Sequence, residues 1–385
     1  MGKWEMVRLG DVCNLNMGQS PESSSYNETG EGLPFYQGNA DFGELYPIIR
    51  YHCSAPKKIA LPNDILLSVR APIGALNIAN EKCCIGRGLA ALTPVKNLEM
   101  KYLYYILKDN HAELNAKGTG STFKAINKSN LSDFEIPLPP LKIQQNIAAT
   151  LDTAAALLKL RQQQLAELEA LIQSVFYEMF GDLALNKMKW EKRVLVEFCK
   201  NESDIRCGPF GTQLSKDEYK TEGVALWGIP QINTKFKIKP TDFLSEKKAI
   251  QLAAYSIIAG DIVMSRKGNV GKCAIYPDNF SSGIMHSDAL RIRVDNKKIS
   301  SIFLMHQLHH SRYVLNQIES VSSGAVMAGV NVTKLKKIFI HNPPIEIQNK
   351  FAAIVQKIDQ QKALVQQSID ETQTLFDSLM SQYFD

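Results

Sequence analysis

The fold of this protein is decided by the stretch Pro139-Pro140-Leu141-Lys142-Ile143-Gln144-Gln145, which returns as Pro343-Pro344-Ile345-Glu346-Ile347-Gln348-Asn349. The second stretch follows the first by 204 residues, and this spacing holds without a gap over about 60 residues of each copy. Pairs that match at this spacing include Gly120 with Gly324, Asn127 with Asn331, Leu131 with Leu335, Ala148 with Ala352 and Phe180 with Phe384. Self-similarity at a fixed period marks an internal repeat, so the chain is a tandem duplication.

The earlier part of each copy repeats more loosely. Trp4-Glu5 returns as Trp190-Glu191, and Asp64-Ile65-Leu66-Leu67-Ser68 with Gly74 returns as Asp261-Ile262-Val263-Met264-Ser265 with Gly271. The spacing therefore grows from 186 to 197 and then to 204 residues, through insertions in the early part. Each copy joins a variable segment to a segment of fixed length.

The fixed segment of each copy is predicted to be one long helix with a hydrophobic seam. After each Pro-Pro pair, which ends the preceding structure, apolar residues recur at alternating spacings of four and three residues, as in a heptad. The first seam runs through Leu151, Ala154, Leu158, Arg161, Leu165, Leu168, Ile172, Val175 and Met179. The second runs through Phe351, Val355, Ile358, Lys362, Val365, Ile369, Thr372, Phe376, Leu379 and Tyr383, so that Arg161, Lys362 and Thr372 are the polar interruptions.

Two matching seams in one chain are expected to pack on each other as an antiparallel coiled coil, with the two copies related by a pseudo-two-fold axis. The alternative is two separate amphipathic helices, each covering the domain of its own copy.

The variable segments are predicted to be mixed, strand-rich globular domains. Short apolar runs, such as 64–69 and 289–294, are separated by Gly, Pro and Asn turns, and one helix per copy is expected at 100–110 and 301–317. The predicted fold class is α+β. It has globular domains at 1–140 and 183–344 and long helices at 141–182 and 345–385.

Composition excludes several classes of protein. With 385 residues, 45% of them hydrophobic, the chain can bury the cores of two or three domains. The N-terminal stretch Met1-Gly2-Lys3-Trp4-Glu5 has no apolar signal segment, and no run approaches the roughly 20 apolar residues of a membrane span. Seven cysteines without a Cys-x-x-Cys pair argue against a disulfide framework or structural zinc and favour the cytoplasm.

The basic residues are concentrated in one segment. The whole chain has a net charge of +5, whereas residues 186–344 alone carry +10 and residues 1–140 carry zero. Such an excess favours a polyanionic partner for the second globular segment, although a solvated lysine-rich surface would give the same count.

One motif resembles a catalytic signature but lacks a required residue. Asn342-Pro343-Pro344-Ile345 resembles the Asn-Pro-Pro-aromatic sequence with which adenine methyltransferases hold an extruded base. Ile345 replaces the aromatic residue, and the first copy has Leu138-Pro139-Pro140-Leu141 without any Asn. The motif is therefore interpreted as the junction between domain and helix.

Other candidate sites are also incomplete. Asp242 and Glu246, with Lys248, are too close in sequence to lie on adjacent strands around one metal ion. His306, His309 and His310 have no acidic residue in register, and Gly268–Lys272 is two residues short of a phosphate-binding loop. We therefore predict a non-catalytic chain without a cofactor-binding or metal-binding site.

Polar, Gly-rich loops at corresponding places in both copies suggest recognition of DNA. Arg, Lys, Asn and Gln read base edges, while Lys, Arg, Ser, Thr and backbone amides hold phosphates. The candidate DNA-binding residues of the first copy are Gln19, Ser20, Gln37, Asn39, Arg70, Arg87, Lys117 and Thr119. Those of the second copy are Gln213, Gln231, Asn233, Arg266, Lys267, Asn269, Lys272 and His286.

At these residues the chain resembles the specificity subunit of type I restriction–modification systems over nearly its whole length. The motifs that carry the resemblance are Trp-Glu at the start of each copy, Arg8-Leu9-Gly10-Asp11-Val12, Gly32-Leu33-Pro34-Phe35-Tyr36, Gly208-Pro209-Phe210-Gly211-Thr212-Gln213-Leu214, Gly260-Asp261-Ile262-Val263-Met264-Ser265-Arg266, Asn127-Lys128-Ser129, Asn331-Val332-Thr333, Pro139-Pro140-Leu141 with Gln144-Gln145, and Met179-Phe180-Gly181-Asp182. Each motif is loose by itself, but their order, repeated twice, is specific.

The resemblance implies two target recognition domains, each reading one half of a bipartite, asymmetric DNA site, and helices that set the spacer between the halves. It also implies as partners double-stranded DNA, two methyltransferase subunits and ATP-dependent restriction subunits. Those partners would use S-adenosylmethionine, ATP and Mg²⁺, while this chain would bind no cofactor. Two other hypotheses stay open at this point: an autonomous methyltransferase or nuclease, and a protein-binding scaffold.

Overall fold

The structure is a computed structural model that describes residues 4–95, 97–119, 124–267, 271–323 and 329–384. It divides into two compact units, the first formed by residues 1–163 and 366–385 and the second by residues 164–365. Each unit therefore contains the globular part of one copy and a part of both long helices, α5 (Leu141–Phe180) and α11 (Ile345–Phe384). These helices confirm the two predicted from the repeated Pro-Pro stretch.

The first unit contains two sheets and a short strand pair. One sheet has the order β2-β10-β7-β8, formed by Cys13–Met17, Leu89–Pro94, Ile65–Ser68 and Leu76–Ile78. The other has the order β3-β5-β4-β9-β6, formed by Tyr26–Asn27, Tyr51–Cys53, Leu33–Tyr36, Cys83–Ile85 and Ile59–Ala60. Strand β1 (Met6–Arg8) pairs with β11 (Glu135–Pro137), and the helices α1, α2, α3 and α4 span Leu9–Val12, Met100–Asp109, His111–Ala116 and Lys128–Ser132.

The second unit repeats this plan. Its first sheet has the order β13-β20-β17-β18, formed by Ile205–Cys207, Ala289–Ile292, Ile262–Ser265 and Cys273–Ile275. Its second sheet has the order β15-β14-β19-β16, formed by Phe243–Leu244, Val224–Trp227, Gly283–Met285 and Ser256–Ile257. Two strand pairs join β12 (Glu191–Val194) to β23 (Phe339–Asn342) and β21 (Ser322–Ser323) to β22 (Gly329–Val330). Helices α6, α7, α8, α9 and α10 span Ile229–Asn233, Glu246–Gln251, Ser301–His310, Arg312–Val321 and Val332–Leu335.

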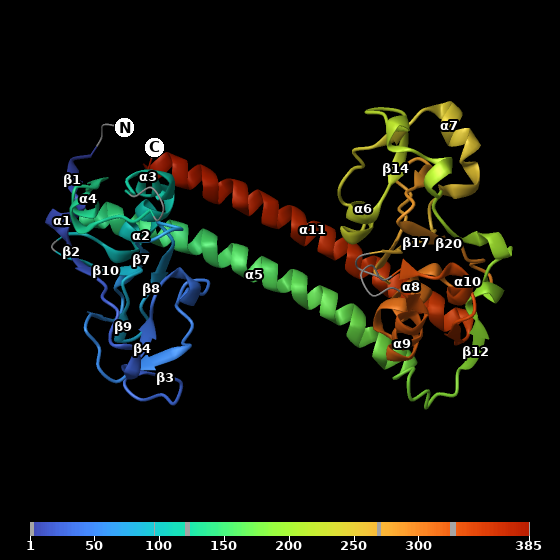
Figure 1. The fold of residues 1–385 in the computed structure, drawn as a ribbon, viewed down its shortest axis with the longest axis horizontal. Coiled ribbons are helices and arrows are strands. Elements are labelled where there is room, and N and C mark those ends of the chain that lie inside the picture. The colour runs from blue at the N-terminus through green and yellow to red at the C-terminus, as the bar shows by residue number, and fades with distance from the viewer. Residues whose placement is uncertain (1–3, 96, 120–123, 268–270, 324–328, 385) are drawn as a thin grey trace. The chain divides into compact units, whose positions relative to one another are not determined.

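The prediction of a single helix at 301–317 was wrong, because the structure has two consecutive helices there, α8 and α9. Ser311 takes an extended backbone conformation with ψ of 109°, which ends α8 before α9 begins at Arg312. The first copy has the same arrangement, since α2 is followed at once by α3 (Figure 1).

The core of each unit is completed by a helix from the other copy. In the first unit, Phe376 and Met380 of α11 belong to the same buried cluster as Leu92 of the sheet and Leu151 of α5. In the second unit, Phe176 and Phe180 of α5 pack on Phe351 of α11, with ring centroids 5.6 and 5.4 Å apart. The alternative in which each helix covers only the domain of its own copy is therefore excluded.

The polar interruptions of the seams are satisfied by specific partners. Arg161 of α5 donates to the Ser368 carbonyl and to Thr372 Oγ1 of α11 in the first unit. In the second unit Lys362 of α11 donates to Glu169 of α5 and to Asp359. Burial alone would raise the pKa of Glu169, but the hydrogen bonds from Lys235 and Lys362 lower it to about 2.

The repeated Gln of the Pro-Pro stretch explains why each helix begins where it does. Gln144 is fully buried; its Oε1 accepts from the Glu99 amide at 2.8 Å, and its Nε2 donates to the carbonyls of Asn97 and Pro139. Gln348 makes the corresponding bonds to the Ser300 amide at 2.9 Å and to the Pro343 carbonyl at 2.7 Å. Each Gln therefore ties the first turn of a long helix to the N-terminus of α2 or α8.

Two further observations complete the fold. Among the described residues, no helix has an apolar run long enough to cross a membrane. The seven cysteines, all within the described ranges, are free thiols.

Candidate nucleic-acid interface

Loops that are distant in sequence meet at one surface of the first unit. Backbone hydrogen bonds join residue 18 to 89, residue 19 to 85, residues 86 and 88 to 36 and 37, residue 69 to 88, and residue 126 to 69. Thr119 exchanges two backbone bonds with Ala125, which also forms a bridge with Arg70. We call residues 18–20, 36–39, 68–70, 86–88, 119 and 124–126 the first loop patch.

The second unit builds the same surface with the same backbone bonds. We call residues 208–213, 227–228, 265–267, 286–288 and 329–330 the second loop patch. Five backbone bonds of the first patch have direct counterparts in the second. Those of the first patch run, from N–H to carbonyl, from Gly18 to Leu89, Gly86 to Tyr36, Leu89 to Gly86, Val69 to Gly88 and Ile126 to Val69. Their counterparts, in the same order, run from Gly208 to Ala289, His286 to Trp227, Ala289 to His286, Arg266 to Asp288 and Val330 to Arg266. The two patches therefore share one backbone frame and differ in the side chains that it carries.

A glycine closes each frame at the point of nearest backbone approach. A Cβ atom on Gly18 would lie 2.1 Å from the carbonyl oxygen of Gly86, and one on Gly208 would lie 2.1 Å from that of His286. Neither contact is sterically allowed, so both positions require glycine. Gly211, three residues after Gly208, differs because a Cβ there meets no heavy atom of the described residues within 4 Å.

The side chains of the first patch are mostly available to a ligand. Gln19, Gln37, Arg70, Arg87 and Thr119 are exposed, and Asn39 is half-buried. Ser20 is also half-buried, and its Oγ accepts a 3.4 Å hydrogen bond from the Arg87 amide.

Lys117 lies beside the first patch and is engaged within the protein. Its Nζ lies 3.2 Å from Glu113 and 4.9 Å from the centroid of the Phe134 ring.

The second patch has more contacts among its own side chains. The Arg266 guanidinium lies 4.9 Å from the centroid of the Phe210 ring, and Lys267 pairs with Asp288 at 2.9 Å. Nδ1 of His286 accepts from the Asp288 amide at 3.2 Å, which orients the ring. Gln213 Oε1 accepts from the Phe210 amide and from the Tyr255 hydroxyl, so Gln213 also orders the loop that carries Phe210.

The remaining predicted residues of the second copy lie in different environments. Lys272 is exposed, Asn233 is half-buried in α6, and Asn269 lies outside the described residues. Gln231 is only 6% exposed, and its amide accepts from the Gly228 N–H and donates to the Lys239 carbonyl. This geometry gives Gln231, a candidate DNA-binding residue in the sequence, a structural role at the start of α6.

One exposed aromatic residue of the second patch was missed as a candidate. Phe210 is 51% exposed and follows Gly208 by two residues, where the first copy has Ser20 after Gly18. The signal in the sequence was the Gly-Pro-Phe-Gly loop, which places a large apolar side chain in a turn.

The three histidines of α8, which the sequence offered as a candidate cluster, lie outside both patches. His306 is 7% exposed, and burial, with repulsion from His310 and His309, lowers its pKa to about 3. His309 Nε2 lies 3.2 Å from the Cys273 Sγ atom, and burial lowers the pKa of His309 to about 4. Within the described part of the chain, no group of three or more His, Cys, Asp or Glu side chains is arranged to hold a metal ion.

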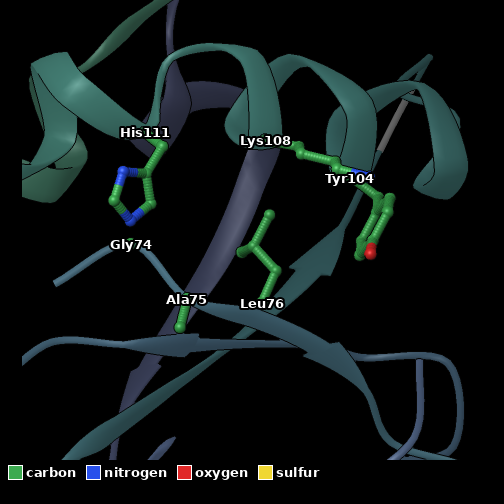
Figure 2. Close-up of a pocket in the computed structure, with 6 residues that line it drawn as sticks. All are labelled: Gly74, Ala75, Leu76, Tyr104, Lys108 and His111. Carbon is green, nitrogen blue, oxygen red and sulfur yellow. The ribbon is translucent and has the colours of Figure 1, made fainter. Parts of the chain in front are cut away.

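The first unit has a hollow of about 290 Å³ that is lined by residues 74–76 and by Tyr104, Lys108 and His111. Figure 2 shows these lining residues. The lining includes none of the candidate DNA-binding residues.

The known proteins to which the chain is similar include specificity subunits of type I restriction enzymes. A putative type I restriction enzyme MjaX specificity subunit from Methanocaldococcus jannaschii is 43% identical over 169 residues, which cover 43% of this chain and 40% of that protein. The type I restriction enzyme MjaIX specificity subunit of the same organism is 24% identical over 392 residues, covering 92% of this chain and 86% of that protein. The chain thus spans less than half of the first relative and most of the second.

The fold is also shared with a solved structure. The crystal structure of a type I restriction-modification system S subunit from M. genitalium has a TM-score of 0.64 and 18% identity, and the match covers 100% of this chain and 96% of that one. A family model for the type I restriction modification DNA specificity domain matches residues 1–170 and 188–373, and the chain therefore belongs to this family.

Proposed function

We propose that this chain is the DNA specificity subunit of a type I restriction–modification complex, and that each loop patch reads one half of a bipartite, asymmetric DNA site. The observation that carries the proposal is the shared backbone frame of the two patches, which presents different side chains in each unit. A shared backbone frame would let the two patches bind DNA in the same geometry, and their different side chains would let them recognise two different half-sites. The family to which the chain belongs supports the same reading.

The proposal assigns contacts with DNA to the side chains that the patches and their flanks present. In the first unit these are Gln19, Ser20, Gln37, Asn39, Arg70, Arg87, Lys117 and Thr119. In the second they are Gln213, Asn233, Arg266, Lys267, Lys272 and His286, with Asn269 retained from the sequence. The exposed Lys and Arg suit phosphates, while Gln and Asn suit base edges.

The long helices are proposed to form an antiparallel coiled coil that relates the two copies by a pseudo-two-fold axis and sets the spacer between the half-sites. Within the first unit, Arg161 of α5 bonds Thr372 of α11, and within the second, Glu169 of α5 bonds Lys362 of α11. These pairs support the antiparallel direction, because the later residue of α5 is bonded to the earlier residue of α11. Seven residues of a heptad seam rise by about 10 Å, so deleting one heptad would shorten the spacer by about three base pairs.

The helices and their flanks are also proposed to bind two methyltransferase subunits, to which restriction subunits add. In this proposal the chain is not an enzyme and works in the cytoplasm. The partners supply the chemistry with S-adenosylmethionine, ATP and Mg²⁺, and this chain holds none of them.

The experiment that tests the proposal is single-molecule methylation mapping in cells. One strain expresses the chain with the methyltransferase subunit proposed as its partner, and a second strain expresses the chain alone. We expect a bipartite adenine-methylated motif only in the first strain. Methylation by the chain alone would show that it is an autonomous enzyme, and no mark in either strain would contradict the proposed role.

Two glycine substitutions assign the half-sites to the patches. Gly18→Ala forces a clash in the first frame and Gly208→Ala in the second, so each should lose the discrimination of one half-site while the other half is still read. Gly211→Ala is the matched control in the same loop, because its Cβ meets no described heavy atom within 4 Å. Loss of both half-sites from either single substitution would contradict the independence of the two patches.

A further inference from the structure

The two loop patches differ in chemistry at two pairs of equivalent positions. Val69 and Arg266 occupy the same place in the shared frame, since their amides donate to Gly88 O and Asp288 O respectively. Val69 is 3% exposed, whereas Arg266 is only partly buried and lies against Phe210. The residue of the first patch that corresponds to Phe210 is Ser20. The second patch therefore presents an arginine and an aromatic ring where the first presents neither.

Arg266 is fixed from three sides. Its amide donates to Asp288 O at 2.8 Å, its Nε lies 3.4 Å from the Val330 carbonyl, and its guanidinium lies 4.9 Å from the Phe210 ring centroid. The cation–π contact with the Phe210 ring and the bond through Nε restrain the guanidinium group. An arginine restrained in this way is suited to planar, two-point recognition, which a point charge on a phosphate does not require.

Phe210 is also fixed, although half of its side chain is exposed. Gln213 Oε1 accepts from the Phe210 amide at 3.2 Å and is itself held by the Tyr255 hydroxyl at 2.8 Å. An exposed, ordered aromatic side chain next to a restrained arginine provides an apolar contact beside a two-point hydrogen-bond donor.

We propose that Arg266 reads a guanine and that Phe210 contacts the 5-methyl group of a neighbouring thymine in the half-site of the second patch. This inference rests on the proposed function. In the major groove, arginine bonds O6 and N7 of guanine, and apolar side chains contact the thymine methyl group. A separation of 4.9 Å suits neighbouring base pairs, which are about 3.4 Å apart along the helix axis. The half-site of the first patch has no such pair of readers, because Val69 is buried.

The test uses the full chain bound to its methyltransferase subunit and a pool of random duplex DNA. The bound fraction is sequenced for the wild type and for Arg266→Ala, Arg266→Lys and Phe210→Ala. Arg312→Ala is the matched control, since Arg312 is an exposed arginine at the start of α9 and lies outside the second patch. The selected duplex is then made with uracil in place of single thymines, which removes only the methyl group.

We expect one half of the wild-type consensus to contain a guanine next to a thymine. Arg266→Ala should reduce the preference for that guanine by about 5- to 150-fold, and Arg266→Lys should lose it as well, because lysine keeps the charge without the planar fork. Uracil at the neighbouring position should weaken wild-type binding about fourfold and leave Phe210→Ala unchanged. The other half of the consensus should stay the same in every variant.

Each other outcome overturns a defined statement. A wild-type consensus that Arg266→Ala leaves unaltered would refute the guanine contact, and equal binding of uracil and thymine duplexes by the wild type would refute the methyl contact. Changes confined to the half that Gly18→Ala disrupts would refute the assignment to the second patch. Failure of the wild type to select any consensus would instead overturn the proposed function.

Discussion

Replacing Gln144 by Leu should destabilise the first unit by about 3 to 5 kcal/mol. Leu has a similar shape, so the change removes three hydrogen bonds without opening a large cavity. The bond to the Pro139 carbonyl is fully buried, which puts the cost of its loss at about 1 to 3 kcal/mol, and the part-buried bonds to Glu99 and Asn97 add about 1 kcal/mol each.

The matched control is Gln145→Leu. Gln145 is the next residue of the same helix turn and is exposed, so its replacement should change the free energy of unfolding by less than about 0.5 kcal/mol. The repeat supplies a second, independent pair, because Gln348→Leu and Asn349→Leu should show the same contrast in the second unit.

The assay must report the two units separately, since a chain with two cores need not unfold in one step. Native-state hydrogen exchange read by mass spectrometry provides this, with peptides from α2 (Met100–Asp109) for the first unit and from α8 (Ser301–His310) for the second. The reasoning would be refuted if Gln144→Leu matched Gln145→Leu, or if it lowered protection equally in α2 and α8.

Four other substitutions test the electrostatics. Burial in the folded protein lowers the pKa of His306 to about 3, against about 6.5 in the unfolded chain. The stability present above pH 6.5, on the order of 5 kcal/mol, is therefore lost as the pH falls from 6.5 to 3. His306→Phe should reduce the dependence of α8 exchange on pH between about 4 and 6.5. Asp261→Asn should lower the stability of the second unit by about 3 kcal/mol, because it removes a two-point ion pair with Arg293 at 2.7 Å. Asp64→Asn should lower the stability of the first unit by only about 1 kcal/mol, because Asp64 accepts a hydrogen bond from the neutral hydroxyl of Thr93. Equal losses of stability in urea titrations would contradict this ranking. Lys272→Ala should weaken DNA binding to every sequence alike and reduce the slope of log affinity against log salt by about one, and a slope unchanged across a salt titration would exclude a phosphate contact.

Much of the fold could be read from the sequence because the duplication supplied two versions of each signal. The Pro-Pro stretch and the heptad spacing identified α5 and α11, and the match between Gly74 and Gly271 marked a turn in which both residues have positive φ, +96° and +84°. The break at Ser311 was missed, since a serine is compatible with a helix and the apolar spacing continues through it.

The site could be predicted less completely. The candidate loops were identified by their polar residues and by their recurrence in both copies. That these loops lie together in one patch depends on backbone hydrogen bonds between distant segments, such as the bond from Gly88 to Gln37, and such bonds leave no pattern in the local sequence. The burial of individual side chains could not be read from the sequence either. Gln231 and Arg266 are both polar residues near glycines, but in the structure Gln231 is buried at the start of a helix and Arg266 is partly exposed.

The sharing of each core between the two copies has a consequence for how the chain is made. The core that contains Leu92 and Leu151 lacks Phe376 and Met380 until the ribosome has translated some 200 further residues beyond Gln163. At about 5 to 20 residues per second this interval lasts about 10 to 40 s, during which the apolar side of the first half of α5 is uncovered. A nascent chain in this state is a substrate for chaperones and proteases, and a chain stopped by premature termination never leaves it. The core of the first unit is therefore closed only when the last helix has been made.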